Sequence, residues 1–203
     1  MLVGANLRPA ITAVGPLVGR IGAELRLGSA ALGLLGSVPL LAFALVSPVV
    51  GSLTRRIGSD RLLVGATLAL AGATVTRSLP FGPAALWSGT VLIGIFVAVG
   101  NVIVPAVIKR DFPTEVPRVT GLYSGLLGGT AAFASGLALP VADAAGWRVS
   151  LGFWALLSLA AALFWLPRLR AADDRVAVPT IEGRAPSMWA SPVAWQVTGV
   201  MAT

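Results

Sequence analysis

The stretch PAALWSGTVLIGIFVAVGNVIVPAVI, residues 83–108, decides the fold class because it contains no charged side chain over its whole length. An α-helix needs about 20 apolar residues, at 1.5 Å each, to cross the hydrocarbon core of a bilayer. The rest of the chain agrees: 56% of its 203 residues are hydrophobic and 11% are charged, whereas a soluble domain carries about 25% charged residues. We therefore expect an all-α membrane protein.

The same length criterion predicts six transmembrane helices and the start of a seventh. The expected spans are Met1–Val18, Ala30–Leu53, Leu62–Leu79, Pro83–Ile108, Val119–Ala142 and Val149–Leu166. A six-helix unit would occupy residues 1–167, a polar cytoplasmic linker would occupy 168–191, and 192–203 would begin a seventh helix too short to cross the bilayer. We interpret the chain as a fragment, with a half-size protein that assembles from two copies as the alternative.

Basic residues alternate between the predicted loops in a way that indicates an orientation. If the N-terminus is cytoplasmic, the inner segments hold Arg55, Arg56, Arg61, Lys109, Arg110, Arg118, Arg168, Arg170, Arg175 and Arg184, and the outer segments hold Arg20, Arg26, Arg77 and Arg148. Such a bias follows the positive-inside rule and predicts a multi-pass protein of the inner (plasma) membrane with a cytoplasmic N-terminus. The net charge of +7 is thereby explained by topology, so we expect no nucleic-acid partner.

Several kinds of chemistry are disfavoured by composition. The sequence contains no cysteine and no histidine, and its eight acidic residues fall in predicted loops or at span ends. The usual nucleophiles, acid–base pairs and metal ligands are therefore lacking. We expect no enzyme activity, no catalytic residue, no bound metal and no cofactor, and we find no carboxylate placed to carry a proton through the membrane.

Arg8 is a basic residue predicted to lie inside a span, well away from its outer end. It stands about 18 Å along the helix from Arg20 at the outer end, which places it near the middle third of the membrane. Pro9 removes a backbone donor and is expected to bend or loosen the helix there, beside the amide of Asn6. Three placements are open: a water-filled cavity that binds a solute, snorkelling to the inner headgroups, and an internal structural role. We favour the cavity, because an arginine without a resident counter-ion suits an anionic or polar ligand.

The fourth predicted span contains a similar polar point. Asn101 lies about 12 Å from Lys109 at the inner end, and Pro105 follows it. Interrupted helices at corresponding positions of two three-helix units are typical of the binding sites of inverted-repeat transporters.

In the fifth span, Gly121, Gly125 and Gly129 recur every four residues and predict a face for close helix packing.

One loop and five further phrases of the sequence resemble a known family. The loop GSLTRRIGSDR, residues 51–61, is similar to the G-x-x-x-D-[RK]-x-G-[RK]-[RK] loop of the major facilitator superfamily, with Arg55 in place of the aspartate. Five further phrases resemble the cyanate and nitroimidazole permease branch of that superfamily: NLRPAITAVGPL (6–17), GNVIVPAVIKRDFP (100–113), TGLYSGLLGG (120–129), GWRVSLGFWALL (146–157) and SPVAWQVT (191–198).

The resemblance implies a twelve-helix transporter made of two six-helix halves, each a 3+3 inverted repeat, that rock about a central site. The solute would be a small anionic or polar molecule, cyanate-like or nitroimidazole-like, moved by alternating access; a non-transporting membrane fragment that packs with a partner half is the alternative. Partners would be the solute, the lipid bilayer, and a C-terminal half or a second copy. The implied solute-facing residues are Asn6, Arg8, Asn101 and Tyr123.

The resemblance also implies a set of gating residues on the inner loops. They are Gly51, Arg55, Arg56, Gly58, Asp60 and Arg61 on one loop and Lys109, Arg110 and Asp111 on the next. Their charged members would exchange partners as a cavity opens and closes. The alternative is that these charges serve only the positive-inside topology.

Overall fold

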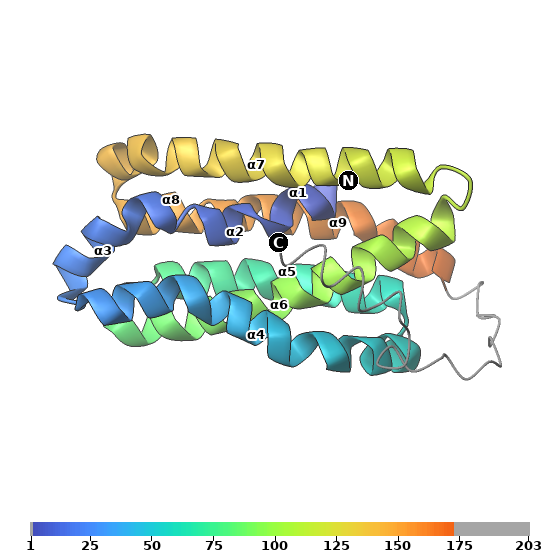
Figure 1. Ribbon diagram of the computed structural model, residues 1–203, viewed down its shortest axis with the longest axis horizontal. Helices are drawn as coiled ribbons and strands as arrows, with labels where there is room; N and C mark the ends of the chain where they lie inside the picture. The colour runs from blue at the N-terminus through green and yellow to red at the C-terminus, as the bar shows by residue number, and fades with distance from the viewer. Residues whose placement is uncertain (1, 173–203) are drawn as a thin grey trace, which may run out of the picture. The chain divides into compact units, whose positions relative to one another are not determined.

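The computed structural model describes residues 2–172, and within that range every regular element is a helix. The elements are α1 Leu2–Leu7, α2 Pro9–Thr12, η1 Gly15–Leu17, α3 Val18–Leu25, α4 Ser29–Ile57, α5 Ser59–Ser78, α6 Gly82–Asp111, α7 Val116–Ala145, α8 Trp147–Gly152 and α9 Trp154–Ala172. They run alongside one another in one bundle, with α7 and α4 on opposite sides of the view in Figure 1.

Four helices are long and apolar enough to cross a membrane: α4, α6, α7 and the stretch Trp147–Leu169. The described part of the chain is thus built as a membrane protein. The 20-residue helix α5 is not among the four, and it carries Asp60 and Arg61 in its first turn and Arg77 in its last. The segment before Arg26 is divided among four short elements. A count of six spans in a 3+3 repeat therefore stays a prediction.

The observed helices differ from the expected spans mainly at their ends. Helix α6 begins and ends within three residues of the predicted 83–108 span, and α4 runs past Leu53 to Ile57. The first segment continues beyond Val18 to Leu25. Helix α9 does not end at Pro167 but continues to Ala172. Residues 168–172, which we expected in the linker, are therefore helical. The rest of that linker and the predicted seventh helix lie outside the described residues.

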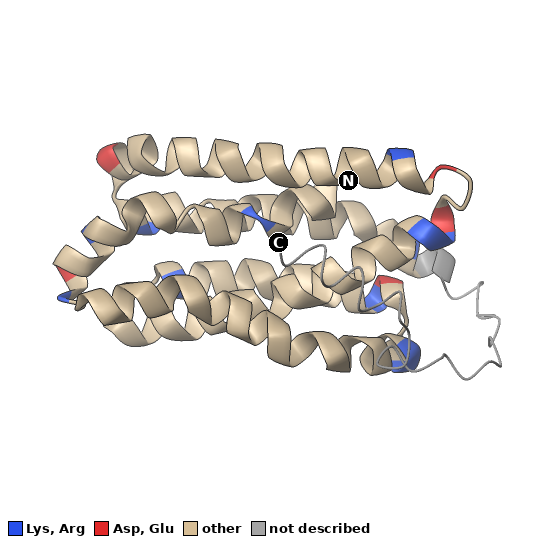
Figure 2. Cartoon of the chain, in the orientation of Figure 1, with Lys and Arg blue, Asp and Glu red and all other residues tan. Residues whose placement is uncertain are grey.

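Charged residues gather mainly toward the two ends of the bundle (Figure 2). Arg77 lies in the last turn of α5, at the end of the helix where we expected an outer segment, but its side chain is enclosed, with 1% of its surface exposed. Helices α5 and α6 approach closely there: a Cβ added to Gly89 of α6 would lie 2.5 Å from the Cβ of Arg77. This close packing encloses the arginine.

The buried core joins the first segment to the helices around it. Leu17 and Ile21 pack with Leu35 of α4 and Leu151 of α8, and all four are essentially inaccessible. Helix α5 lies against α6 and α9, and α4 lies against α6. The faces of α4 and α7 are far less buried, with large exposed side chains such as Leu40, Leu45, Leu122 and Phe133.

The glycine face of α7 is open within the described residues. No atom lies within 4 Å of a Cβ built on Gly121, Gly125 or Gly129. The expectation that these glycines pack against a neighbouring helix of this unit is therefore wrong. The surface they form remains accessible to a separate helix.

Candidate functional site

The first membrane segment is interrupted at Arg8, as the sequence predicts. Helix α1 ends at Leu7 and α2 begins at Pro9, which has no N–H to donate to the turn before it. Arg8 itself keeps right-handed helical dihedral angles, and its carbonyl accepts hydrogen bonds from the backbone N–H groups of Ile11 and Thr12. Its side chain is exposed, so the guanidinium is not enclosed by this unit.

Two other predicted residues meet beside this segment. The hydroxyl of Tyr123 on α7 donates to Oδ1 of Asn101 on α6, over 3.4 Å, and Tyr123 is 6% exposed. Arg8 comes directly after Leu7, whose side chain packs against Gly100 beside Asn101. Arg8, Asn101 and Tyr123 therefore lie on three adjoining membrane segments, and we refer to them as one polar group.

Gly4 explains how the Tyr123 ring reaches this position. A Cβ at Gly4 would lie 2.6 Å from two carbons of the Tyr123 ring, so α1 and α7 touch through a glycine. On the next helix, a Cβ at Gly100 would lie 2.5 Å from Leu7, so α1 and α6 also approach closely. The sequence analysis missed both glycines, because glycine is frequent throughout this chain.

Asn6 lies apart from the polar group formed by Arg8, Asn101 and Tyr123. It is 1% exposed, and its Oδ1 accepts a hydrogen bond of 2.8 Å from Ser158 on α9, while its Nδ2 has no partner. The side chain thus ties α1 to α9 in the interior. Ser158 was missed because serine is common in apolar helices and gives no signal in a single sequence.

A cluster of charges joins α5, α6 and α9 at one end of the bundle. Nη1 of Arg110 donates to Oδ2 of Asp60 over 3.0 Å, and its Nε donates to Oδ1 of Asp111 over 2.7 Å. Arg168 of α9 donates to Asp111, and the indole N–H of Trp165 donates to Asp60 over 3.3 Å. Asp60 is 9% exposed. Both carboxylates, of Asp60 and Asp111, lie between Arg110 and Arg168.

This cluster connects the two predicted gating loops but uses only some of their residues. Asp60, Arg110 and Asp111 take part, while Arg55, Arg56 and Lys109 are exposed. Gly58 forms the joint between α4 and α5 with φ +89°, in the region that favours glycine. Arg168 and Trp165 were not among the predicted gating residues, and Arg168 was expected in the linker beyond the last span.

Comparison with known proteins identifies the family. The sequence profile of the Major Facilitator Superfamily matches residues 3–203, which is nearly the whole chain. The chain belongs to the Major Facilitator Superfamily.

Three curated relatives refine this placement. The chain is 41% identical over 201 residues to the uncharacterized transporter YycB of Bacillus subtilis (strain 168), covering 98% of the chain and 49% of that relative. It is 39% identical over 199 residues to the 2-nitroimidazole transporter of Escherichia coli (strain K12), covering 98% of the chain and 50% of that relative. It is also 28% identical over 166 residues to the cyanate transport protein CynX of Escherichia coli (strain K12), covering 81% and 43%.

These matches confirm the predicted resemblance to the cyanate and nitroimidazole branch of the Major Facilitator Superfamily. The chain spans about half the length of the curated relatives it matches. The polar group formed by Arg8, Asn101 and Tyr123 therefore belongs to one half-length unit of a superfamily member.

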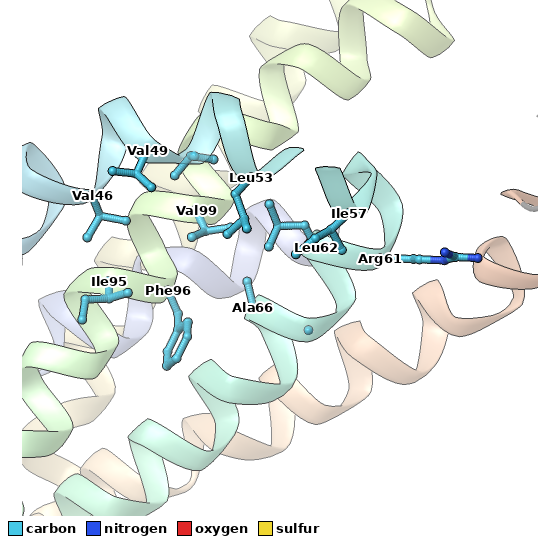
Figure 3. A pocket seen from close by; sticks show the side chains of 12 residues that line it. Val46, Val49, Leu53, Ile57, Arg61, Leu62, Ala66, Ile95, Phe96 and Val99 are labelled. Atoms are coloured by element: carbon cyan, nitrogen blue, oxygen red, sulfur yellow. The ribbon is translucent and has the colours of Figure 1, made fainter. Parts of the chain in front are cut away.

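One hollow in this superfamily unit is a poor site for a polar solute. It has a volume of about 340 Å³ and lies between α4, α5 and α6, lined almost entirely by aliphatic side chains and Phe96 (Figure 3). Arg61 lies at its edge and extends away from the other lining residues. Because a polar solute needs hydrogen-bond partners when it leaves water, this hollow does not replace the polar group around Arg8.

Proposed function

We propose that this chain is the N-terminal six-helix half of a secondary transporter that moves a small anionic or polar solute by alternating access. Membership of the Major Facilitator Superfamily points to a transporter and away from an enzyme. Relatives named for 2-nitroimidazole and cyanate transport support a cyanate-like or nitroimidazole-like solute.

The observation that carries this proposal is the Tyr123–Asn101 hydrogen bond next to the segment that carries the exposed Arg8, a segment that touches both helices. Arg8 supplies a permanent positive charge and a planar fork of donors, and Asn101 supplies a second amide. No ion pair within residues 2–172 includes Arg8. A solute anion would supply the charge that Arg8 lacks, while Tyr123 would orient Asn101. Asn6 would act as a positioning residue through Ser158.

Alternating access requires a second unit against which this one rocks. A C-terminal half or a second copy of the chain would cover the exposed side chains of α4 and α7, including the open face of Gly121, Gly125 and Gly129. Arg8 would then line a cavity between the two units. The favoured arrangement is a twelve-helix protein with a 3+3 repeat in each half.

The Asp60–Arg110–Asp111–Arg168 cluster would be the inner gate of this transporter. Its ion pairs cross three helices, so a change in helix angle would break some of them and free their charges for new partners. Exposed Arg55 and Arg56, with Arg61 and Lys109, would supply the alternative contacts, Gly58 would provide the turn between α4 and α5, and Gly51 would belong to the gate as part of α4. With this end cytoplasmic, the N-terminus is also cytoplasmic in the inner membrane.

The test is solute uptake by a reconstituted pair of halves. The chain would be co-expressed with the C-terminal half of the Bacillus subtilis relative, purified as a pair and placed in liposomes with labelled cyanate or 2-nitroimidazole. We expect saturable uptake that falls at least about 100-fold in Arg8→Gln, the loss expected when a charged hydrogen bond of roughly 3 kcal/mol is removed. The melting temperature should not change, since Arg8 is exposed.

The matched control is Arg118→Gln, which removes another exposed charge from the helix that carries Tyr123 and should leave uptake unchanged. Unchanged uptake kinetics in Arg8→Gln would remove this arginine from the site. No uptake by the wild-type pair, with intact helicity, would favour the alternative of a membrane unit that only packs with a partner.

A further inference from the structure

Arg77 carries a buried positive charge for which the described part of the chain holds no counter-ion. Its Nη1 donates to the carbonyl of Ala10 over 2.7 Å, whereas Nε and Nη2 have no hydrogen-bond partner. No ion pair within residues 2–172 includes Arg77. Burying a charged group with unused donors is costly unless something pairs with it.

The interruption of the first segment accounts for the contact that Arg77 does make. In an unbroken helix the N–H of Val14 would donate to Ala10, but here it donates to Ile11 over 3.4 Å. The carbonyl of Ala10 therefore remains available as an acceptor, and Nη1 of Arg77 donates to it from α5. This single contact holds Nη1 and leaves Nε and Nη2, on the other edge of the guanidinium, without partners.

A small cavity borders this arginine. It has a volume of about 190 Å³ and lies between the first segment, α4 and α6, with Thr12, Leu35, Gly36, Pro39, Arg77 and Thr90 among its lining residues. A water molecule occupies about 30 Å³ of liquid, so the space is large enough for an ion of a few atoms with some water. Thr12 and Thr90 are the uncharged polar residues of its lining, and their hydroxyl groups donate to backbone carbonyl oxygens.

From this arrangement we infer that the cavity is a binding site for a small planar oxyanion of the nitrate or formate kind, held by Nε and Nη2 of Arg77. These two nitrogens form one edge of the guanidinium plane, and their parallel N–H bonds match two oxygens of a planar anion. Both nitrogens are shielded from water here, so binding requires the guanidinium to turn toward the cavity. The anion would supply the counter-charge that Arg77 lacks.

This site is separate from the polar group around Arg8 and does not depend on the proposed solute. Arg8 is exposed and lies between α1 and α2, whereas Arg77 comes from α5 and is enclosed. A resident anion would neutralise Arg77 while the arginine holds Ala10. It would therefore stabilise the interrupted first segment and the unit as a whole.

The test is thermal unfolding of the full chain in a non-ionic detergent, in which no lipid phosphate competes. Sodium nitrate would replace sodium chloride at constant total salt. A ligand that binds only the folded state raises Tm, and we expect a saturable rise of roughly 3–6 °C with half of the effect at millimolar nitrate. Weak general salt effects of nitrate do not saturate, so the shape of the curve identifies a site.

Two variants assign the effect to this cavity. Arg77→Lys keeps the charge but loses the planar fork, and Gly36→Leu fills the cavity from α4, where nothing lies within 4 Å of an added Cβ. Both should reduce the nitrate shift by more than half. The control Gly33→Leu changes an equally open glycine of α4 that does not line the cavity, and it should keep the full shift, as should Arg8→Gln.

Each result bears on the proposal. If Arg77→Lys does not fold, Gly36→Leu alone decides. The same nitrate shift in Gly36→Leu as in Gly33→Leu would overturn the assignment to this cavity. The absence of any saturable nitrate effect in the wild-type chain would mean that water alone fills the cavity, and the oxyanion site would be rejected. Failure of solute uptake would leave this result unaffected.

Discussion

Arg110 at the end of α6 holds Asp60 at the start of α5 with two hydrogen bonds, Nη1 to Oδ2 over 3.0 Å and Nη2 to Oδ1 over 3.3 Å. The pair fixes the ends of two neighbouring helices side by side. Because Asp60 also accepts from Trp165 of α9, one carboxylate connects three helices.

Asp60→Asn should lower the free energy of unfolding by about 1–3 kcal/mol, because it removes a largely buried charge that pairs with Arg110 and leaves that arginine poorly matched. Thermal unfolding in detergent would measure the change. The matched control is Asp143→Asn, which breaks the exposed pair with Arg20 and should change stability by less than about 0.5 kcal/mol. Equal losses in the two variants would show that Asp60 is no more than a surface charge.

Gly4→Ala should displace the Tyr123 ring, because the added Cβ would lie 2.6 Å from two of its carbons. Overpacking of this kind costs about 1–3 kcal/mol of folding free energy. Gly19→Ala in α3 is the control, since nothing lies within 4 Å of its added Cβ and alanine favours a helix. Thermal unfolding compares the two, and a fluorescence or NMR probe of Tyr123 would report its movement. A Gly4→Ala protein as stable as Gly19→Ala would contradict the close contact between α1 and α7.

Glu24 predicts a pH dependence of stability. Arg148, with the indole N–H of Trp147, holds the pKa of the Glu24 carboxyl below its ordinary value of 4.5. The folded state therefore binds this proton less readily than the unfolded state does. The stabilisation is complete above pH 4.5 and is lost as the pH falls through and below that value.

The measurement is Tm at pH 7 and at pH 3.5 for the wild type and Glu24→Gln. At pH 7 the wild type should have the higher Tm because it keeps the Glu24–Arg148 pair, but only by roughly 2 °C, since exposed pairs contribute little. At pH 3.5 the Tm values of the two proteins should become more similar. Arg148→Gln should remove most of the difference, since it removes the main cause of the shift. A gap between wild type and Glu24→Gln that grows toward acid pH would contradict the sign of this linkage.

The polar group around Arg8 shows how far single-sequence reasoning reaches into a site. Arg8 and Asn101 were predicted from depth and neighbouring prolines, and the family resemblance added Tyr123. The structure joins Tyr123 to Asn101 next to the segment that carries Arg8, but it turns Asn6 toward Ser158. Two residues of one short helix, such as Asn6 and Leu7, face different neighbours, and a single sequence does not say which neighbours those are. The role of each residue in solute binding stays a prediction.

The sequence by itself determined the membrane class, the main helices and the interruption beside Pro9. The length of an apolar run, the spacing of charges and the missing N–H of proline act locally, so their effects can be predicted from a single sequence. Only the tertiary structure decided that Arg77 is enclosed, that Asp60 meets Arg110 and Trp165, and that Gly4 admits Tyr123. Those contacts join residues that are far apart in the chain. The free energy of each contact depends on which helices lie next to each other, and no local sequence pattern specifies that.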